Sequence, residues 1–74
     1  MPTDTAFASA FAIGLGTIGP ALAIGIVGAA AMLSIARNPD VSDKIQTNMI
    51  IVIAFAEAIS IYALITALIL KFVQ

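Results

Sequence analysis

The sequence predicts an all-α membrane protein, a hairpin of two transmembrane helices, on three observations. The chain has 74 residues, of which 62% are hydrophobic and 9% are charged, whereas about a quarter of the residues of an ordinary soluble domain are charged. Two long stretches that are nearly free of charge flank one short polar segment. Two segments cannot close a β-barrel, and an open sheet edge in lipid would leave backbone groups unpaired, so both stretches should be helices.

The first helix is expected over residues 4–36. Residues 5–36 form 32 positions without a charge, more than the roughly 20 that cross a bilayer core. Thr3 or Asp4 could cap its N-terminus. A secretory signal is a poor alternative, because no basic segment precedes the apolar stretch, which is also too long for a signal core. Pro20 lies in mid-span, where it removes one helical hydrogen bond and should bend the helix.

The polar segment at residues 37–44 holds four of the seven charges and should form the loop of a single helical unit that spans residues 1–74. Pro39 cannot continue a helix, and Asp40 or Ser42 could cap the helix that follows. That second helix is expected over residues 45–73.

The basic residues favour a cytoplasmic loop with both termini on the opposite side of the membrane. Arg37 and Lys44 lie in the loop, against Lys71 alone near the C-terminus. The side chain of Lys71 should extend to the membrane interface and anchor that end of the chain.

The composition excludes several classes of function. The chain has no Cys and no His, so it lacks the usual ligands of zinc, haem and iron–sulfur clusters, and it lacks a thiol nucleophile and an imidazole base. We therefore expect no metal, no cofactor and no catalysis by the chain alone. Three basic residues in a chain of net charge −1 cannot form a phosphate-binding patch, which excludes nucleic-acid binding.

Small residues form a continuous stripe along the first helix, and all five glycines lie in this span. Small faces are how helices associate in lipid, where burying large apolar side chains gains little. One partner helix cannot cover so wide a face, so the chain is expected to form a homo-oligomer; the alternative is that the glycines pack only within one hairpin. Steps of three and four residues define the stripe, which Gly16, Gly19 and Ala23 widen: Ala10, Gly14, Thr17, Ala21, Gly25 and Gly28.

The functional argument starts from Glu57, which lies near the middle of the bilayer, about 18 Å into the second apolar stretch at 1.5 Å per residue. No Lys, Arg or His of this chain shares that depth. Because an ionised carboxylate is expensive in lipid, the group should be protonated there and should ionise only where water or a positive charge is supplied. Glu57 is therefore a candidate proton-binding site; the alternative is a buried acid that is merely hydrogen-bonded to a neighbour.

Groups near Glu57 could hold its protonated form. Ser60 follows it by three residues and shares its face, whereas Tyr62 points elsewhere and could reach a neighbouring copy or simply pack between copies. Phe55 could offer its backbone carbonyl. Reflecting the hairpin about its loop pairs the acid with Ile24 and Gly25, so a small residue should lie opposite it.

These features together resemble the c-subunit of the rotary F-type ATP synthase, the proteolipid of the membrane rotor. The resemblance covers essentially the whole chain. It is carried by the order and spacing of three elements: the Gly/Ala-rich first helix, the loop Ala36-Arg37-Asn38-Pro39-Asp40, and the segment Phe55-Ala56-Glu57-Ala58-Ile59-Ser60-Ile61-Tyr62.

The resemblance implies a ring of identical hairpins in membrane lipid, with first helices inside and second helices outside. Glu57 would take a proton from one half-channel of the stator a-subunit and release it near a stator arginine into the other. The turning ring would drive ATP synthesis elsewhere through a central stalk of gamma and epsilon subunits. The implied stalk contacts are Arg37, Asn38 and Pro39, which could otherwise be only a solvated turn, and the implied ring-packing residues are Gly14, Gly19, Ala21, Ala23, Gly25 and Gly28.

Two departures from the family pattern bear on ring size and on the coupling ion. Ala21 and Ala23 replace glycines of the family's alternating series, which could set neighbouring helices slightly farther apart. Relatives that use sodium have an amide at the position of Ile24 and hydroxyls at those of Ala58 and Ile59. Sodium requires several oxygen ligands, so we expect the coupling ion to be the proton.

Two other readings are open. A pore-forming or scaffold hairpin, such as a holin-like protein, would share the composition and the small-residue packing, but it does not need one acid at mid-depth. The proteolipid of a V- or A-type ATPase is the other, and the short chain and its loop favour the F-type. The absence of a transit segment favours a bacterial plasma membrane.

Overall fold

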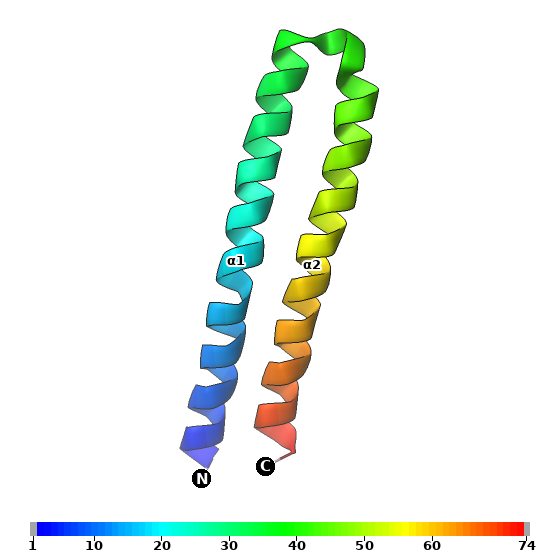
Figure 1. Cartoon of the computed structure of the whole chain (residues 1–74). Coiled ribbons are helices and arrows are strands. Elements are labelled where there is room, and N and C mark those ends of the chain that lie inside the picture. The colour runs from blue at the N-terminus through cyan, green and yellow to red at the C-terminus, as the bar shows by residue number, and fades with distance from the viewer. Residues whose placement is uncertain (1, 74) are drawn as a thin grey trace.

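The computed structural model is a hairpin of two antiparallel helices, and it describes residues 2–73, with side chains described from Asp4 onward. Helix α1 spans Pro2–Arg37, a 3₁₀ turn η1 spans Pro39–Val41, and helix α2 spans Ser42–Phe72. Both ends of the chain lie together, opposite the connection (Figure 1). The predicted all-α hairpin is confirmed.

Each helix is long and apolar enough to cross a membrane. The hairpin is 57 Å long and 15 Å by 9 Å across, whereas the hydrocarbon core of a bilayer is about 30 Å thick. Both ends of the hairpin therefore extend beyond the hydrocarbon, and the charged residues other than Glu57 lie toward those ends.

The connection is shorter than the predicted loop at 37–44, because Arg37 continues α1 and Ser42 begins α2. Between Arg37 and Ser42, Asn38 alone lies outside a helix, and its amide N–H donates to the carbonyl of Ser34 at 2.9 Å. The 3₁₀ turn then leads directly into α2. A tight connection of this kind holds the two helices side by side.

The predicted N-caps of α2 are wrong. Asp40 lies inside the 3₁₀ turn and Ser42 is already helical, while the cap position belongs to Val41, with no side-chain hydrogen bond. The turn makes a side-chain cap unnecessary there, since the amide of Ser42 donates to the carbonyl of Pro39. For α1, Thr3 lies outside the residues whose side chains are described, and Asp4 lies in the first turn rather than at a cap.

Small residues bring the helices together along one line, which we call the seam. A Cβ atom added to Gly16 would lie 2.6 Å from the Cβ of Ala63, closer than real Cβ atoms approach one another. The hydroxyl of Ser9 donates across the same line to the carbonyl of Ala67 at 2.7 Å. Buried residues mark the rest of the seam: Pro20 and Ala31 on α1, and Ala56 and Ala67 on α2.

Helix α1 continues through Pro20 as a single helix, although the proline lacks the N–H that a helix interior needs. Pro20 is buried against α2, and Gly16 lies one turn before it on the same face. The seam thus includes the interior position at which a proline leaves a carbonyl of α1 without its helical donor.

Candidate functional site

Glu57 lies halfway along α2, thirteen residues after Lys44 and fourteen before Lys71, or about 20 Å from each at 1.5 Å per residue. Its side chain is exposed on the single hairpin. Among the residues that the structure describes, no hydrogen bond or ion pair reaches its carboxyl group. The described residues of one chain therefore do not hold the acid.

The position of Glu57 relative to the seam follows from helix geometry. Ala56 is buried against α1, and each further residue turns about 100° around the helix axis. Glu57 thus lies about a quarter turn from the seam, on one broad side of the hairpin, which we call the front side. Because the two helices run antiparallel, an α1 residue that comes one position after a seam residue also faces the front side.

The small-residue stripe of α1 also faces the front side, beginning one residue after the seam residue Ser9. Nothing in the hairpin lies within 4 Å of a Cβ added to any of four glycines: Gly14, Gly19, Gly25 and Gly28. Ala10 and Ala21 are exposed too. The alternative in which all glycines pack within one hairpin is therefore wrong, because only Gly16 does so.

The opposite broad side, the back side, carries other predicted site residues. Tyr62 and Phe55 are 69% and 70% exposed, and both lie more than a quarter turn from the seam in the direction away from Glu57. Gly19 of α1 shares this side, whereas Ala23 follows Gly16 by two turns and is half-buried near the seam. One hairpin therefore cannot bring Tyr62 or Phe55 to its own Glu57, whereas the back side of a second copy can.

The seam register sets the α1 residue at the depth of the acid. Gly16 faces Ala63, and counting six residues toward the connection on both helices places Leu22 level with Glu57. Ile24 and Gly25 lie two and three residues nearer the connection than this level. Ser60 is half-buried near the seam, and Ala58 is half-buried on α2.

The residues of the connection that were singled out, Arg37, Asn38 and Pro39, are all exposed at the end of the hairpin. At the other end, the ammonium group of Lys71 lies 5.4 Å from the ring centroid of Phe72. Phe7 and Phe11 stack there as well, with ring centroids 5.8 Å apart. This end therefore carries the aromatic and cationic groups typical of a membrane interface.

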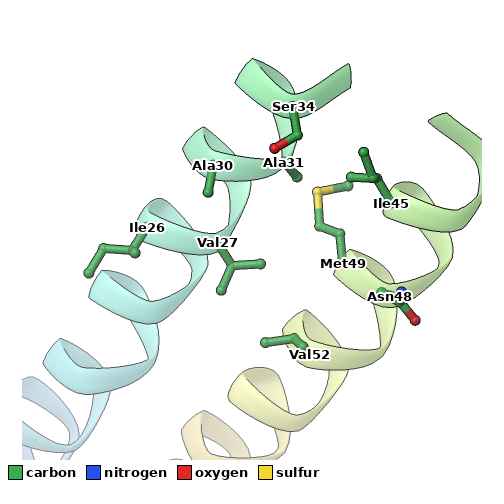
Figure 2. A pocket seen from close by; sticks show the side chains of 9 residues that line it. All are labelled: Ile26, Val27, Ala30, Ala31, Ser34, Ile45, Asn48, Met49 and Val52. Atoms are coloured by element: carbon green, nitrogen blue, oxygen red, sulfur yellow. The ribbon is translucent and has the colours of Figure 1, made fainter. Parts of the chain in front are cut away.

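An apolar groove lies between the helices near the connection, away from Glu57 (Figure 2). Its volume is about 360 Å³, and Ala31 and Met49 approach one another across it. It contains none of the predicted proton-site residues. Its lining residues are Ile26, Val27, Ala30, Ala31, Ser34, Ile45, Asn48, Met49 and Val52.

Sequence reasoning missed two features of the hairpin: the bond from Ser9 to the Ala67 carbonyl, and the separate role of Gly16. The available signal for Gly16 was its spacing from Pro20 and Ser9, at steps of four and seven residues, which differs from that of the stripe. The described residues contain no group of three or more His, Cys, Asp or Glu that could hold a metal ion.

Comparisons with known proteins agree on one family. A family model described as the C-subunit of ATP synthase matches residues 7–70. A protein of Dehalococcoides mccartyi that is named as an ATP synthase c-subunit is 48% identical over 89% of this chain and 87% of its own length. Proteins of the same name from a Synechococcus species and from Chloroflexus aurantiacus are 50% and 45% identical; these matches cover 86% and 88% of this chain and 79% and 86% of the relatives.

Proposed function

We propose, from the premise that this chain belongs to the family of ATP synthase c-subunits, that Glu57 is the carboxyl group through which it works as the proton-translocating rotor subunit of an F-type ATP synthase. The observation that carries the proposal is one acid at mid-membrane depth, exposed on the hairpin and without a partner among the described residues of its own chain. Ionisable groups at that depth mark ion pathways. The protein is a non-catalytic part of the complex.

Identical copies form a ring, in which the front side of one hairpin meets the back side of the next. The open glycines support this arrangement, because they allow close backbone approach and meet nothing within the chain. A head-to-tail contact of two different surfaces closes into a ring when the rotation between copies allows it. The contact is made by Gly14, Gly19, Ala21, Ala23, Gly25 and Gly28.

The ring interface also completes the proton site. Glu57 of one copy faces the backbone carbonyl of Phe55 and the hydroxyl of Tyr62 on the next copy, which can accept from or donate to a neutral carboxyl group. Ala58 and Ile24 supply apolar walls that keep water away, and Ser60 supports the acid from its own helix. Away from the stator the site is thus dry and protonated, since an anion would be costly there.

At the stator the same acid exchanges its proton. We assign this exchange to the stator a-subunit, with half-channels that supply water and an arginine that stabilises the carboxylate. The exposed connection at Arg37, Asn38 and Pro39 contacts the gamma and epsilon subunits of the central stalk. The loop then lies in the cytoplasm of a bacterial plasma membrane and both termini lie on the other side, which agrees with the basic residues of the connection.

The coupling ion is the proton. Sodium-using members of the family have oxygen-bearing side chains at three positions. In this chain these positions are occupied by Ile24, Ala58 and Ile59, none of which has an oxygen in its side chain. Sodium would find only the carboxylate, one carbonyl and one hydroxyl, which are too few for a hard cation. The two alternative functions are less well supported. A pore-forming hairpin does not need a single acid at mid-membrane depth, and a V- or A-type proteolipid has different partners.

The test is to reconstitute an ATP synthase that contains this chain into lipid vesicles, with Glu57 or with Glu57→Gln. We expect Glu57→Gln to abolish proton-driven ATP synthesis, because the amide cannot take up and release a proton. A carbodiimide, which reacts with protonated acids, should modify only Glu57 among the residues within the membrane. Ser34→Ala, at an exposed position near the connection, serves as the control.

Continued synthesis in the Glu57→Gln enzyme would rule out the proposed role of the acid. A chain that remains monomeric in lipid would likewise exclude the ring.

A further inference from the structure

The threonine and serine hydroxyl groups of the two spans differ in their hydrogen-bond partners. Three threonines donate to the carbonyl four residues earlier in their own helix, at 2.7 to 3.0 Å: Thr17, Thr47 and Thr66. Ser9 instead donates across the seam. Ser60, half-buried near the seam, has no hydrogen bond to any residue that the structure describes. Since it lies at membrane depth, water does not satisfy this hydroxyl freely.

A carbonyl without its helical donor lies on the facing helix. The carbonyl of Gly16 would normally accept a bond from the amide four residues later, but that residue is Pro20, which has no N–H. An unpaired backbone carbonyl in hydrocarbon costs free energy. In membrane helices, neighbouring side chains or ordered waters compensate carbonyls freed by a proline.

The seam brings these two groups to the same depth. Gly16 faces Ala63, and Ser60 lies one turn nearer the connection than Ala63, on nearly the same side of α2. The carbonyl of Gly16 points along α1 toward Pro20, which is also one turn nearer the connection and buried. Ser60 and Pro20 are therefore level with one another, and the freed carbonyl points to that level.

We propose that the Ser60 hydroxyl donates a hydrogen bond to the Gly16 carbonyl through one bridging water, and that this contact fixes the rotation of α2 beside Glu57. The hairpin then has two serine bonds across its seam with opposite directions. Ser9 of α1 donates to α2 at the terminal end. Ser60 of α2 donates to α1 at the depth of the acid.

The consequence for Glu57 is positional, and this part rests on the proposed function. Glu57 precedes Ser60 by three residues, less than one turn. Rotation of α2 about its axis would carry the acid away from the front side and out of reach of the next copy. Ser60 is thus a positioning residue: it does not touch the proton and acts through the orientation of the helix.

Isotope-edited infrared spectroscopy tests the bond directly. The full chain, with ¹³C and ¹⁸O at the Gly16 carbonyl, is inserted into lipid vesicles as the unsubstituted protein, Ser60→Ala, Pro20→Ala and the double variant. We expect Ser60→Ala to raise the stretching frequency of this carbonyl, because it loses its donor. Pro20→Ala returns a backbone N–H, so Ser60→Ala should have little effect in that background.

The functional measurement is the rate at which a carbodiimide labels Glu57 in the assembled enzyme. We expect Ser60→Ala to change this rate about 3-fold, the equilibrium effect of an average side-chain hydrogen bond between membrane helices. Ser34→Ala should leave both the frequency and the rate unchanged.

Two results would overturn the proposal: an unchanged carbonyl frequency in Ser60→Ala, or an equal shift with and without Pro20. An unchanged labelling rate together with a shifted frequency would overturn the positioning role. Absence of any label on Glu57 in the unsubstituted enzyme would contradict the proposed function instead, and it would leave the infrared result standing.

Discussion

Small residues line α1 both at the seam and on the front side of the hairpin, yet these two regions differ in the contacts that one chain makes. At the seam, Gly16 meets Ala63 and Ser9 bonds to the carbonyl of Ala67. On the front side, nothing lies within 4 Å of a Cβ added to Gly14 or Gly25, and Glu57 has no partner among the described residues. One hairpin therefore makes its helix contacts along the seam, whereas its broad sides make contacts only when another copy packs against them.

This difference separates folding from assembly. Residues at the seam contribute to the stability of a single hairpin, whether or not other copies are present. Residues on the broad sides contribute only when copies meet, and the proton site belongs to this second group. Substitutions of otherwise similar residues should therefore fail at different stages.

The largest effect is expected from Gly25→Leu on the front side. A leucine has room on one hairpin, since nothing lies within 4 Å of the position, but it would hold neighbouring copies apart. We expect full helix content by circular dichroism and loss of the ring, measured as the mass of the detergent-solubilised assembly. Ile26→Leu, at an adjacent exposed and already bulky position, should keep the ring. A ring of normal mass in Gly25→Leu would break the distinction between seam and sides.

Gly16→Ala should destabilise the single hairpin by about 1–3 kcal/mol, because the new methyl group overpacks against Ala63. The measurement is the equilibrium unfolding of the chain in mixed micelles, followed by helix content and by proximity of the two termini. Gly14→Ala is the matched control and should be neutral in this assay. Ala63→Gly should rescue Gly16→Ala, and equal losses for the two glycines would contradict the prediction.

Ser9→Ala should cost about 0.6 kcal/mol, the average for hydrogen bonds between membrane helices, and no more than about 1.7 kcal/mol. It removes the donor to the Ala67 carbonyl, so the helices should separate more readily at the terminal end. The same micelle titration measures the loss. Thr66→Ala removes a bond within one helix and should leave the distance between the termini unchanged; a similar effect in both variants would argue against a role for the cross-helix bond.

The smallest effect is expected from sodium. If the ring interface around Glu57 offers too few oxygen atoms to bind sodium, millimolar sodium at neutral pH should not slow labelling of Glu57 by a carbodiimide. The measurement is the labelled fraction by mass spectrometry, with potassium at equal ionic strength as the control. If sodium but not potassium protected Glu57 from labelling, the ring interface would have to supply ligands beyond those expected from Tyr62 and Phe55.

The sequence predicted the hairpin and the mid-membrane acid because these depend on the lengths of the uncharged stretches and on the position of each charged residue along its helix. Counting uncharged residues is enough to find two spans, and counting from Lys44 and Lys71 is enough to centre Glu57. The predicted connection was too long because polarity marks where the chain leaves the lipid, while the helix ends depend on backbone bonds such as that from Asn38 to Ser34.

The sequence did not separate Gly16 from the other glycines, and the reason is physical. Small residues occupy both the seam and the front side of α1, so composition cannot tell which of the two meets α2. The register across the seam requires the positions of both helices. The same register places Leu22 rather than Ile24 level with Glu57, because a reflection about the middle of the polar segment ignores how tightly the connection turns.

The unequal widths of the two helices have a consequence for the shape of an assembly. The front side of α1 carries mainly glycine and alanine, whereas the back side of α2 carries Phe55, Ile59 and Tyr62. Each hairpin is therefore wedge-shaped, narrow at α1 and wide at α2. Wedges that pack side by side form a curved assembly with their narrow edges on the inside, and the wedge angle then determines how many copies close the ring.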